Sequence, residues 1–124
     1  LELRPDYAEV HNNLGKISMR DGDFPAAAGH YEKAVELSPE SPVYRNDLGY
    51  AFVMAGRWAP AAAQFEAALK LKPDYVDALT NLGGVFHQRG DLARAVELYE
   101  AALRLDPRAA NAQKNLALIR SGRN

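Results

Sequence analysis

The chain has 124 residues, a length typical of one domain, and its 15 lysines and arginines nearly balance its 16 aspartates and glutamates. That balance gives no basic footprint for nucleic acid, and no apolar run approaches the roughly 20 residues needed to span a bilayer. We therefore expect neither a nucleic-acid partner nor membrane insertion. The chain contains no cysteine, which excludes a disulfide framework and thiolate chemistry.

The first residues match the ends of two later segments. Leu-Glu-Leu-Arg-Pro at 1–5 parallels Leu-Lys-Leu-Lys-Pro at 69–73 and Leu-Arg-Leu-Asp-Pro at 103–107. We expect residues 1–7 to be the tail of a preceding repeat or a lead-in. The chain is then expected to be a piece of a longer array.

The next segment predicts a pair of helices. The first should run from about residue 8 to 21, because three apolar residues recur in it at helical spacing: Val10, Leu14 and Ile17. Gly22 suits a tight turn, and Asp23 suits the N-cap of a second helix. The second helix carries its own apolar stripe: Ala27, Tyr31, Ala34 and Leu37. Ser38 and Pro39 should end it.

This pattern returns every 34 residues, as the series Gly22, Gly56 and Gly90 shows. The same reading predicts four further paired helices and one unpaired helix: 42–55, 58–71, 76–89, 92–105 and 110–120. The units are therefore expected at 8–41, 42–75 and 76–109, followed by a capping helix and tail at 110–124. A terminal helix of this kind covers the apolar edge of the last unit.

Small residues at fixed positions predict close helix packing. Glycine recurs inside the first helix of each pair, at Gly15, Gly49 and Gly83, although glycine costs a helix roughly 0.5–1 kcal/mol relative to alanine. We expect these glycines to face the small residues of the second helices: Ala27, Ala61 and Ala95. The aromatic series should form the large wedges of the core: Tyr31, Phe65 and Tyr99.

The recurring Leu-Gly, Gly, Ala, aromatic, Ala and Pro positions resemble the pattern of the tetratricopeptide repeat (TPR) family over nearly the whole chain. The resemblance implies an all-α, right-handed α-solenoid of antiparallel helix pairs, with three repeats and a C-terminal capping helix. It also implies a protein-binding scaffold.

No group of residues predicts catalysis. The three histidines occupy different helix positions with no i, i+4 pair, which disfavours a zinc site. We expect His11 to be a packing residue and His30 to lie on the outer face of its helix. We find no hydrolase-like motif and no phosphate loop, and we predict a protein that is not an enzyme and holds no cofactor or metal.

The candidate binding surface is the inner face formed by the first helix of each pair. The predicted peptide-binding residues on it are Asn13, Lys16, Arg20, Asp47, Tyr50, Met54, Asn81, His87 and Asn115. Four of them occupy one repeat position and form an Asn/Asp ladder: Asn13, Asp47, Asn81 and Asn115. This ladder resembles the asparagine ladder of superhelical TPR arrays, including that of O-linked N-acetylglucosamine transferase, which grips a peptide main chain. The alternative is that these side chains bond the adjacent helix.

A second family precedent fits poorly. Chaperone-binding TPR domains clamp a C-terminal carboxylate with lysine, arginine and asparagine, but two of the matching positions here carry Asp47 and Asp77. Their carboxylates would repel that ligand, so we do not expect a chaperone tail of the Glu-Glu-Val-Asp kind. The acidic middle of the face instead favours a ligand carrying lysine or arginine.

The sequence therefore favours binding of an extended peptide or helix in the concave groove. Two alternatives remain open. The chain could be a self-assembling scaffold that stacks end to end through its open repeat edges, as Leu1 and Leu3 suggest, or the recognition arm of a larger enzyme such as a glycosyltransferase.

Overall fold

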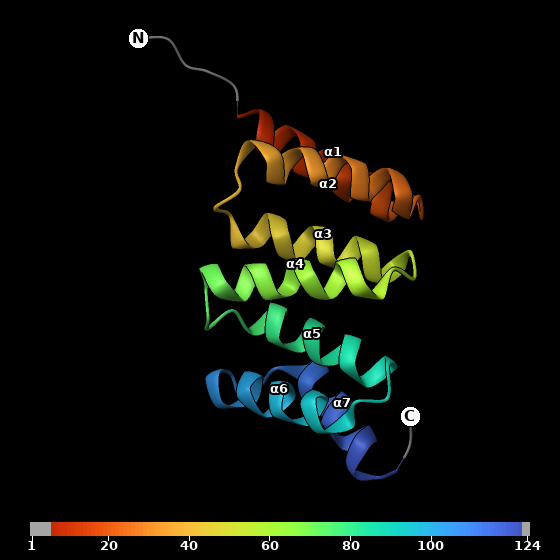
Figure 1. Ribbon diagram of the computed structural model, residues 1–124, viewed down its shortest axis with the longest axis vertical. Coiled ribbons are helices and arrows are strands. Elements are labelled where there is room, and N and C mark those ends of the chain that lie inside the picture. The colour runs from red at the N-terminus through yellow and green to blue at the C-terminus, as the bar shows by residue number, and fades with distance from the viewer. Residues whose placement is uncertain (1–5, 123–124) are drawn as a thin grey trace.

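The helices begin and end within one residue of the bounds that the sequence predicts. The computed structural model describes residues 6–122, and these form the following helices (Figure 1): α1 (Tyr7–Arg20), α2 (Phe24–Leu37), α3 (Pro42–Met54), α4 (Trp58–Leu71), α5 (Val76–Gln88), α6 (Leu92–Leu105) and α7 (Ala110–Arg120). We call α1, α3, α5 and α7 the A helices, and α2, α4 and α6 the B helices. Leu1 and Leu3, which suggested self-assembly, lie outside the described residues.

Local chemistry explains these helix ends. At four N-termini a side-chain oxygen accepts a hydrogen bond from a backbone N–H three residues on, the caps being Asp6, Asp23, Ser41 and Asp91. The A-to-B turns use Gly22, Gly56 and Gly90 at φ of 77°, 76° and 82°. Those left-handed conformations are available to glycine at little steric cost.

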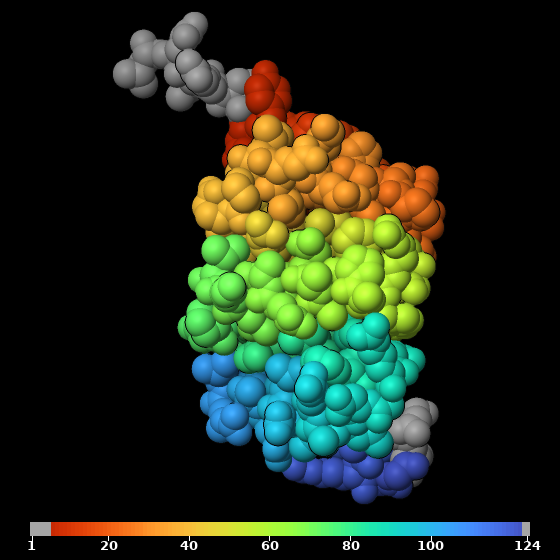
Figure 2. Space-filling view, in the orientation of Figure 1, coloured from red at the N-terminus to blue at the C-terminus, as the bar shows by residue number. Residues whose placement is uncertain are grey.

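The helix pairs stack in chain order along one axis (Figures 1 and 2). Each B helix packs on the A helix before it and on the A helix after it, so α2 lies between α1 and α3. In addition, α3 packs directly on α5, and α5 on α7. The A helices therefore line the inner wall of the stack, as in other repeat arrays.

Three aromatic rings fill the space between paired helices. Tyr31, Phe65 and Tyr99 are buried, and each lies against a glycine of the A helix of its own pair. A Cβ added at Gly49 would lie only 2.6 Å from Cε1 of Phe65, and one at Gly83 would lie 2.7 Å from Cε1 of Tyr99. The nearest neighbours of these glycines are therefore the rings and not, as predicted, Ala27, Ala61 and Ala95. The glycines make room for rings.

Candidate functional site

A hollow of about 360 Å³ lies on the inner wall, between α3, α5 and α7. The side chains of α3 and α5 reach it because helical spacing places them on one face of each helix. Its polar lining residues are Asn46, Asp47, Tyr50, Asp77, Thr80, Asn81, Asp106 and Asn111, and its apolar ones are Val76, Ala109, Ala110 and Ala112.

The hollow is acidic. Asp47, Asp77 and Asp106 all line it, and within residues 6–122 its lining includes no lysine or arginine. Burial raises the pKa of the Asp47 carboxyl above its ordinary value, and Asp77 raises it further. A hydrogen bond from Asn12 and the charge of Lys16 oppose that rise. The result is a partly desolvated carboxylate in a hollow that two further aspartates line, and such a field attracts a cation.

Two members of the Asn/Asp ladder are engaged with a neighbouring A helix. Asn12 Nδ2 donates to Asp47 Oδ2 at 3.0 Å, and Asn81 Nδ2 donates to Asn46 Oδ1 at 3.1 Å. Asn12 and Asn46 are buried, so these bonds satisfy polar groups between repeats. The alternative role for the ladder, bonding to the adjacent helix, is therefore present at Asp47 and Asn81. Replacing Asn81 with alanine would also remove a partner from buried Asn46, so that change affects the fold as well as the groove.

The hollow gathers only part of the predicted site. It brings together Asp47, Tyr50 and Asn81, with the aromatic ring of Tyr50 half exposed. The other predicted residues lie elsewhere on the A helices: Asn13, Lys16, Arg20, Met54, His87 and Asn115.

Two of these outlying residues lie against a core tyrosine. His87 Nδ1 is 3.4 Å from the hydroxyl of Tyr99, and the imidazole meets that ring edge-on. Burial raises the pKa of Tyr99, and a hydrogen bond with Asn115 opposes the rise. His87 and Asn115 therefore both contact the hydroxyl of the buried Tyr99.

Sequence reasoning missed Asp106. This residue follows α6 and precedes α7, and its Oδ1 accepts from the backbone N–H of Arg108. The search for groove residues followed the faces of the A helices and so passed over the connecting loops. A signal did exist, because every B-to-A loop must end beside the inner wall that the next A helix joins.

One histidine of the first repeat differs from expectation. The prediction that His30 lies on the outer face of its helix is wrong, since its ring stacks on that of His11 with centroids 6.3 Å apart. Among the described residues, no three histidine, aspartate or glutamate side chains gather to hold a metal ion. None of the described helices has the length and apolar character to cross a membrane.

Comparison with protein families agrees with the helix pairing and the packing of the repeats. One Tetratricopeptide repeat model matches residues 6–74, and a second matches residues 46–110 and 88–120. The chain belongs to the tetratricopeptide repeat family. A search of curated proteins finds no match.

Solved structures, TPR domains among them, share this fold. The first TPR of Spaghetti (RPAP3), bound to the HSP90 peptide SRMEEVD, superposes with a TM-score of 0.90 at 23% identity, covering 98% of this chain and 97% of that one. The Arabidopsis OM64 TPR domain gives 0.90 at 19% identity, covering 94% and 96%. MamA gives 0.86 at 29% identity, covering 95% of this chain and 69% of that one.

Proposed function

We propose that this TPR chain is a protein-binding module, which takes an extended peptide or a helix along the inner wall of its A helices. We further propose that the hollow between α3, α5 and α7 receives a lysine or arginine side chain of that ligand. The observation that carries the proposal is that three aspartates, Asp47, Asp77 and Asp106, line one hollow. Tetratricopeptide repeats generally serve as interaction modules without catalytic activity, which agrees with this assignment.

The hollow suits a long cationic side chain in size and chemistry. Its volume of about 360 Å³ falls within the range of ligand pockets. The half-exposed ring of Tyr50 offers a face for cation–π contact, while Asp47 and Asp77 offer hydrogen-bond acceptors. Asn46 and Asn81 already bond to each other, which holds both side chains in place at the wall of the hollow.

The presence of an aspartate at position 47 supports a binding role for the hollow. Asparagine occupies the same repeat position in the other three A helices, at Asn13, Asn81 and Asn115. Burial disfavours the charged form of Asp47, whereas an asparagine there would accept the bond from Asn12 without a charge. Functional sites commonly keep such locally costly groups.

The charge of the hollow distinguishes the proposed ligand from the peptides of two structural neighbours. RPAP3 domains bind the HSP90 peptide SRMEEVD and the HSP70 peptide SGPTIEEVD, whose C-terminal ends are acidic. Here Asp47 and Asp77 stand where the sequence comparison with chaperone clamps requires hydrogen-bond donors. Like charges across an interface suppress the wrong partner.

A peptide-pool experiment tests the proposal. Fluorescent extended peptides with lysine, glutamine or glutamate fixed at the central position are titrated with the chain, and anisotropy reports binding. We expect the lysine pool to bind best and the glutamate pool worst. Asp47→Asn should weaken lysine-pool binding about tenfold, the scale of a close charge pair across an interface.

The matched control is Glu97→Gln, which removes the same charge from an exposed site on α6, a B helix. It should leave the affinity unchanged. Equal binding of the three pools, or equal losses in Asp47→Asn and Glu97→Gln, would contradict the assignment of the hollow.

A further inference from the structure

The inner face of α3 carries a stripe of exposed apolar side chains in the middle of the stack. Val43, Tyr50 and Met54 are 48%, 45% and 43% exposed. With Asp47 they follow one another at spacings of four, three and four residues, which places the four side chains on one face of the helix. Asp47 and Tyr50 line the hollow, so this face belongs to the inner wall. We call Val43, Tyr50 and Met54 the α3 stripe.

The stacking of the repeats does not require these apolar side chains. The buried clusters within the described residues contain none of the three. The same repeat positions are polar or glycine on the two neighbouring A helices, where they hold Glu9, Lys16 and Arg20 on α1, and Asp77, Gly84 and Gln88 on α5. Large apolar side chains that gather on an exposed face mark an interaction site, whereas single ones are normal on a protein surface.

Opposite charges flank the α3 stripe. On the side of α5, Asp77 and Asp106 line the hollow. On the side of α1, the matching face carries Lys16 and Arg20, and the charge of Lys16 reaches Asp47. A ligand that covers the stripe therefore meets carboxylates along one edge and cations along the other. Complementary charges on the two edges of the ligand would favour binding and fix its direction.

Gly84 leaves space beside the α3 stripe. It follows Thr80 and Asn81, which line the hollow, by four and three positions, so it lies on the same face of α5. A Cβ added there would lie 3.9 Å from the Tyr99 hydroxyl, an ordinary contact, so packing within the chain does not require a glycine. Glycine nevertheless weakens a helix relative to alanine. A glycine without a packing reason suits a wall that the backbone of a ligand approaches closely.

The Asn/Asp ladder, by contrast, offers little to an extended peptide. Two of its members are already engaged, because Asp47 accepts a hydrogen bond from Asn12 and Asn81 donates one to Asn46. An extended peptide that crosses the A helices would depend on such groups to bond its main chain. The α3 stripe instead runs along one helix, over a length of about 16 Å at 1.5 Å per residue.

We infer that the ligand of the inner wall is an amphipathic α-helix that lies along α3 and packs its apolar face on the α3 stripe. This inference rests on the proposed function and chooses the helix over the extended peptide. The basic residue proposed for the hollow then projects from one edge of that apolar face, and acidic residues on the other edge meet Lys16 and Arg20. A helix with apolar residues at i, i+4, i+7 and i+11 forms such a face, and the four positions of α3 that carry the stripe and Asp47 have the same spacing.

Two peptides with the same residues in a different order test the helix against the extended ligand. In the first peptide, leucines at i, i+4, i+7 and i+11 form one helical face, with lysines along one edge and glutamates along the other. In the second, the leucines alternate with polar residues, which suits an extended strand. Fluorescence anisotropy reports binding to the full chain, and circular dichroism reports whether the bound peptide is helical. We expect the first peptide to bind about tenfold more tightly than the second and to be helical when bound.

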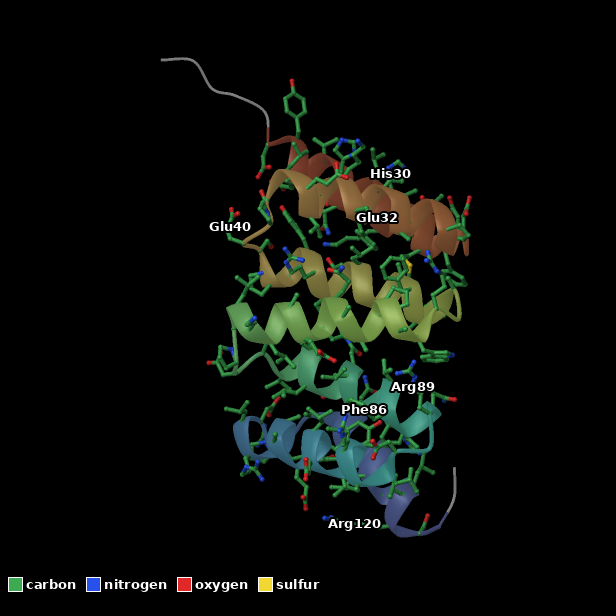
Figure 3. The ribbon with its side chains drawn as sticks, viewed as in Figure 1. His30, Glu32, Glu40, Phe86, Arg89 and Arg120 are labelled. Atoms are coloured by element: carbon green, nitrogen blue, oxygen red, sulfur yellow. The ribbon has the colours of Figure 1, made fainter. Side chains whose placement is uncertain are left out.

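Variants of the chain locate the bound peptide. Tyr50→Ala should weaken binding of the first peptide at least fivefold, because it removes the largest side chain of the stripe. Leu71→Ala is the matched control, since this leucine is also 45% exposed but ends α4, a B helix. Gly84→Leu should weaken binding similarly while its helix content is retained, since leucine favours a helix. Glu32→Gln, at an exposed site on α2 (Figure 3), should change nothing.

The outcomes separate the helix from the hollow. Equal binding of the two peptides, or unchanged binding in Tyr50→Ala and Gly84→Leu, overturns the inference. A tighter second peptide that loses affinity when its lysines become glutamines rejects the helix and keeps the hollow. A tighter first peptide that depends on Tyr50 but not on its lysines keeps the helix and rejects the hollow. Binding of neither peptide overturns both.

Discussion

Leu14 and Leu48 occupy the same position in two successive repeats, yet their surroundings are opposite. Leu48 is buried between α3 and its neighbours in the middle of the stack, whereas Leu14 is exposed on α1 at its end. The glycine that follows each leucine does not differ, because Gly15 and Gly49 both lie against a ring of their own pair. Contacts within a pair are thus complete in every repeat, while contacts between pairs depend on a neighbour.

The strongest way to break the central repeat is Gly49→Leu. A Cβ at this position would meet the fully buried ring of Phe65 at 2.6 Å, so the ring or the helix must shift. We expect a loss of about 3 kcal/mol or more in the free energy of unfolding, at the upper end for overpacking. Urea denaturation followed by circular dichroism measures it.

Gly84 in α5 supplies the control for Gly49→Leu. A Cβ at Gly84 would lie 3.9 Å from the Tyr99 hydroxyl, an ordinary contact. Gly84→Ala should therefore stabilise α5 by roughly 0.5–1 kcal/mol, the usual gain from alanine inside a helix. A Gly49→Leu variant as stable as the parent chain would show that Phe65 is not held against α3.

The second prediction compares Leu14 and Leu48 directly. Leu48→Ala should cost about 2–4 kcal/mol, because it leaves a cavity in the buried cluster. Leu14→Ala should cost less than about 1 kcal/mol, because the side chain is already 39% exposed. Thermal and urea unfolding of both variants at low protein concentration measure the difference. Equal losses would mean that α1 is covered in solution.

The sequence predicts the parts of this fold that depend on local chemistry. Caps such as Asp23, left-handed glycines such as Gly22 and the 34-residue period place each helix end within one residue. The caps and the glycines act over a few residues, and the period carries the same reading from one repeat to the next.

The candidate site was harder to predict because it depends on how successive repeats are rotated. Helical spacing places Asp47 and Tyr50 on one face, and the structure does bring them into one hollow. Helical spacing could not show that Asn12 donates a hydrogen bond to Asp47, because that contact joins two repeats whose relative orientation no local pattern specifies. Asp106 enters from a loop, outside any helical periodicity.

A third, smaller effect concerns the charge at Asp47. Its pKa is raised in the folded chain, so folding opposes the charged form. Below the unfolded pKa of 3.8 the carboxyl is protonated in both states, so it does not lower the free energy of unfolding. As the pH rises through that value and the higher folded pKa, the unfolded state releases its proton more readily, and the free energy of unfolding falls. Asp47→Asn should therefore melt about 1–3 °C above the parent chain at pH 7, a shift worth less than about 1 kcal/mol.

Melting curves at several pH values check this sign. The gap between Asp47→Asn and the parent chain should close as the pH falls below 3.8. A variant that is less stable at pH 7, or a gap that does not change with pH, would mean that the bond from Asn12 outweighs the burial of the charge.

The smallest effect is expected at Ala117, which holds the Gly49 position in α7. Ala117 is exposed, and it borders a surface hollow of about 530 Å³ lined by Leu103 and Leu116. Within the described residues no aromatic ring follows α7 to press on it, so Ala117→Leu should change the free energy of unfolding by no more than about 0.5 kcal/mol. Gly83→Ala is the matched comparison, because its Cβ would meet Tyr99 at 2.7 Å and should cost about 1–3 kcal/mol. If urea unfolding instead shows Ala117→Leu to be the more damaging of the two, the outer face of α7 is packed against another surface in solution.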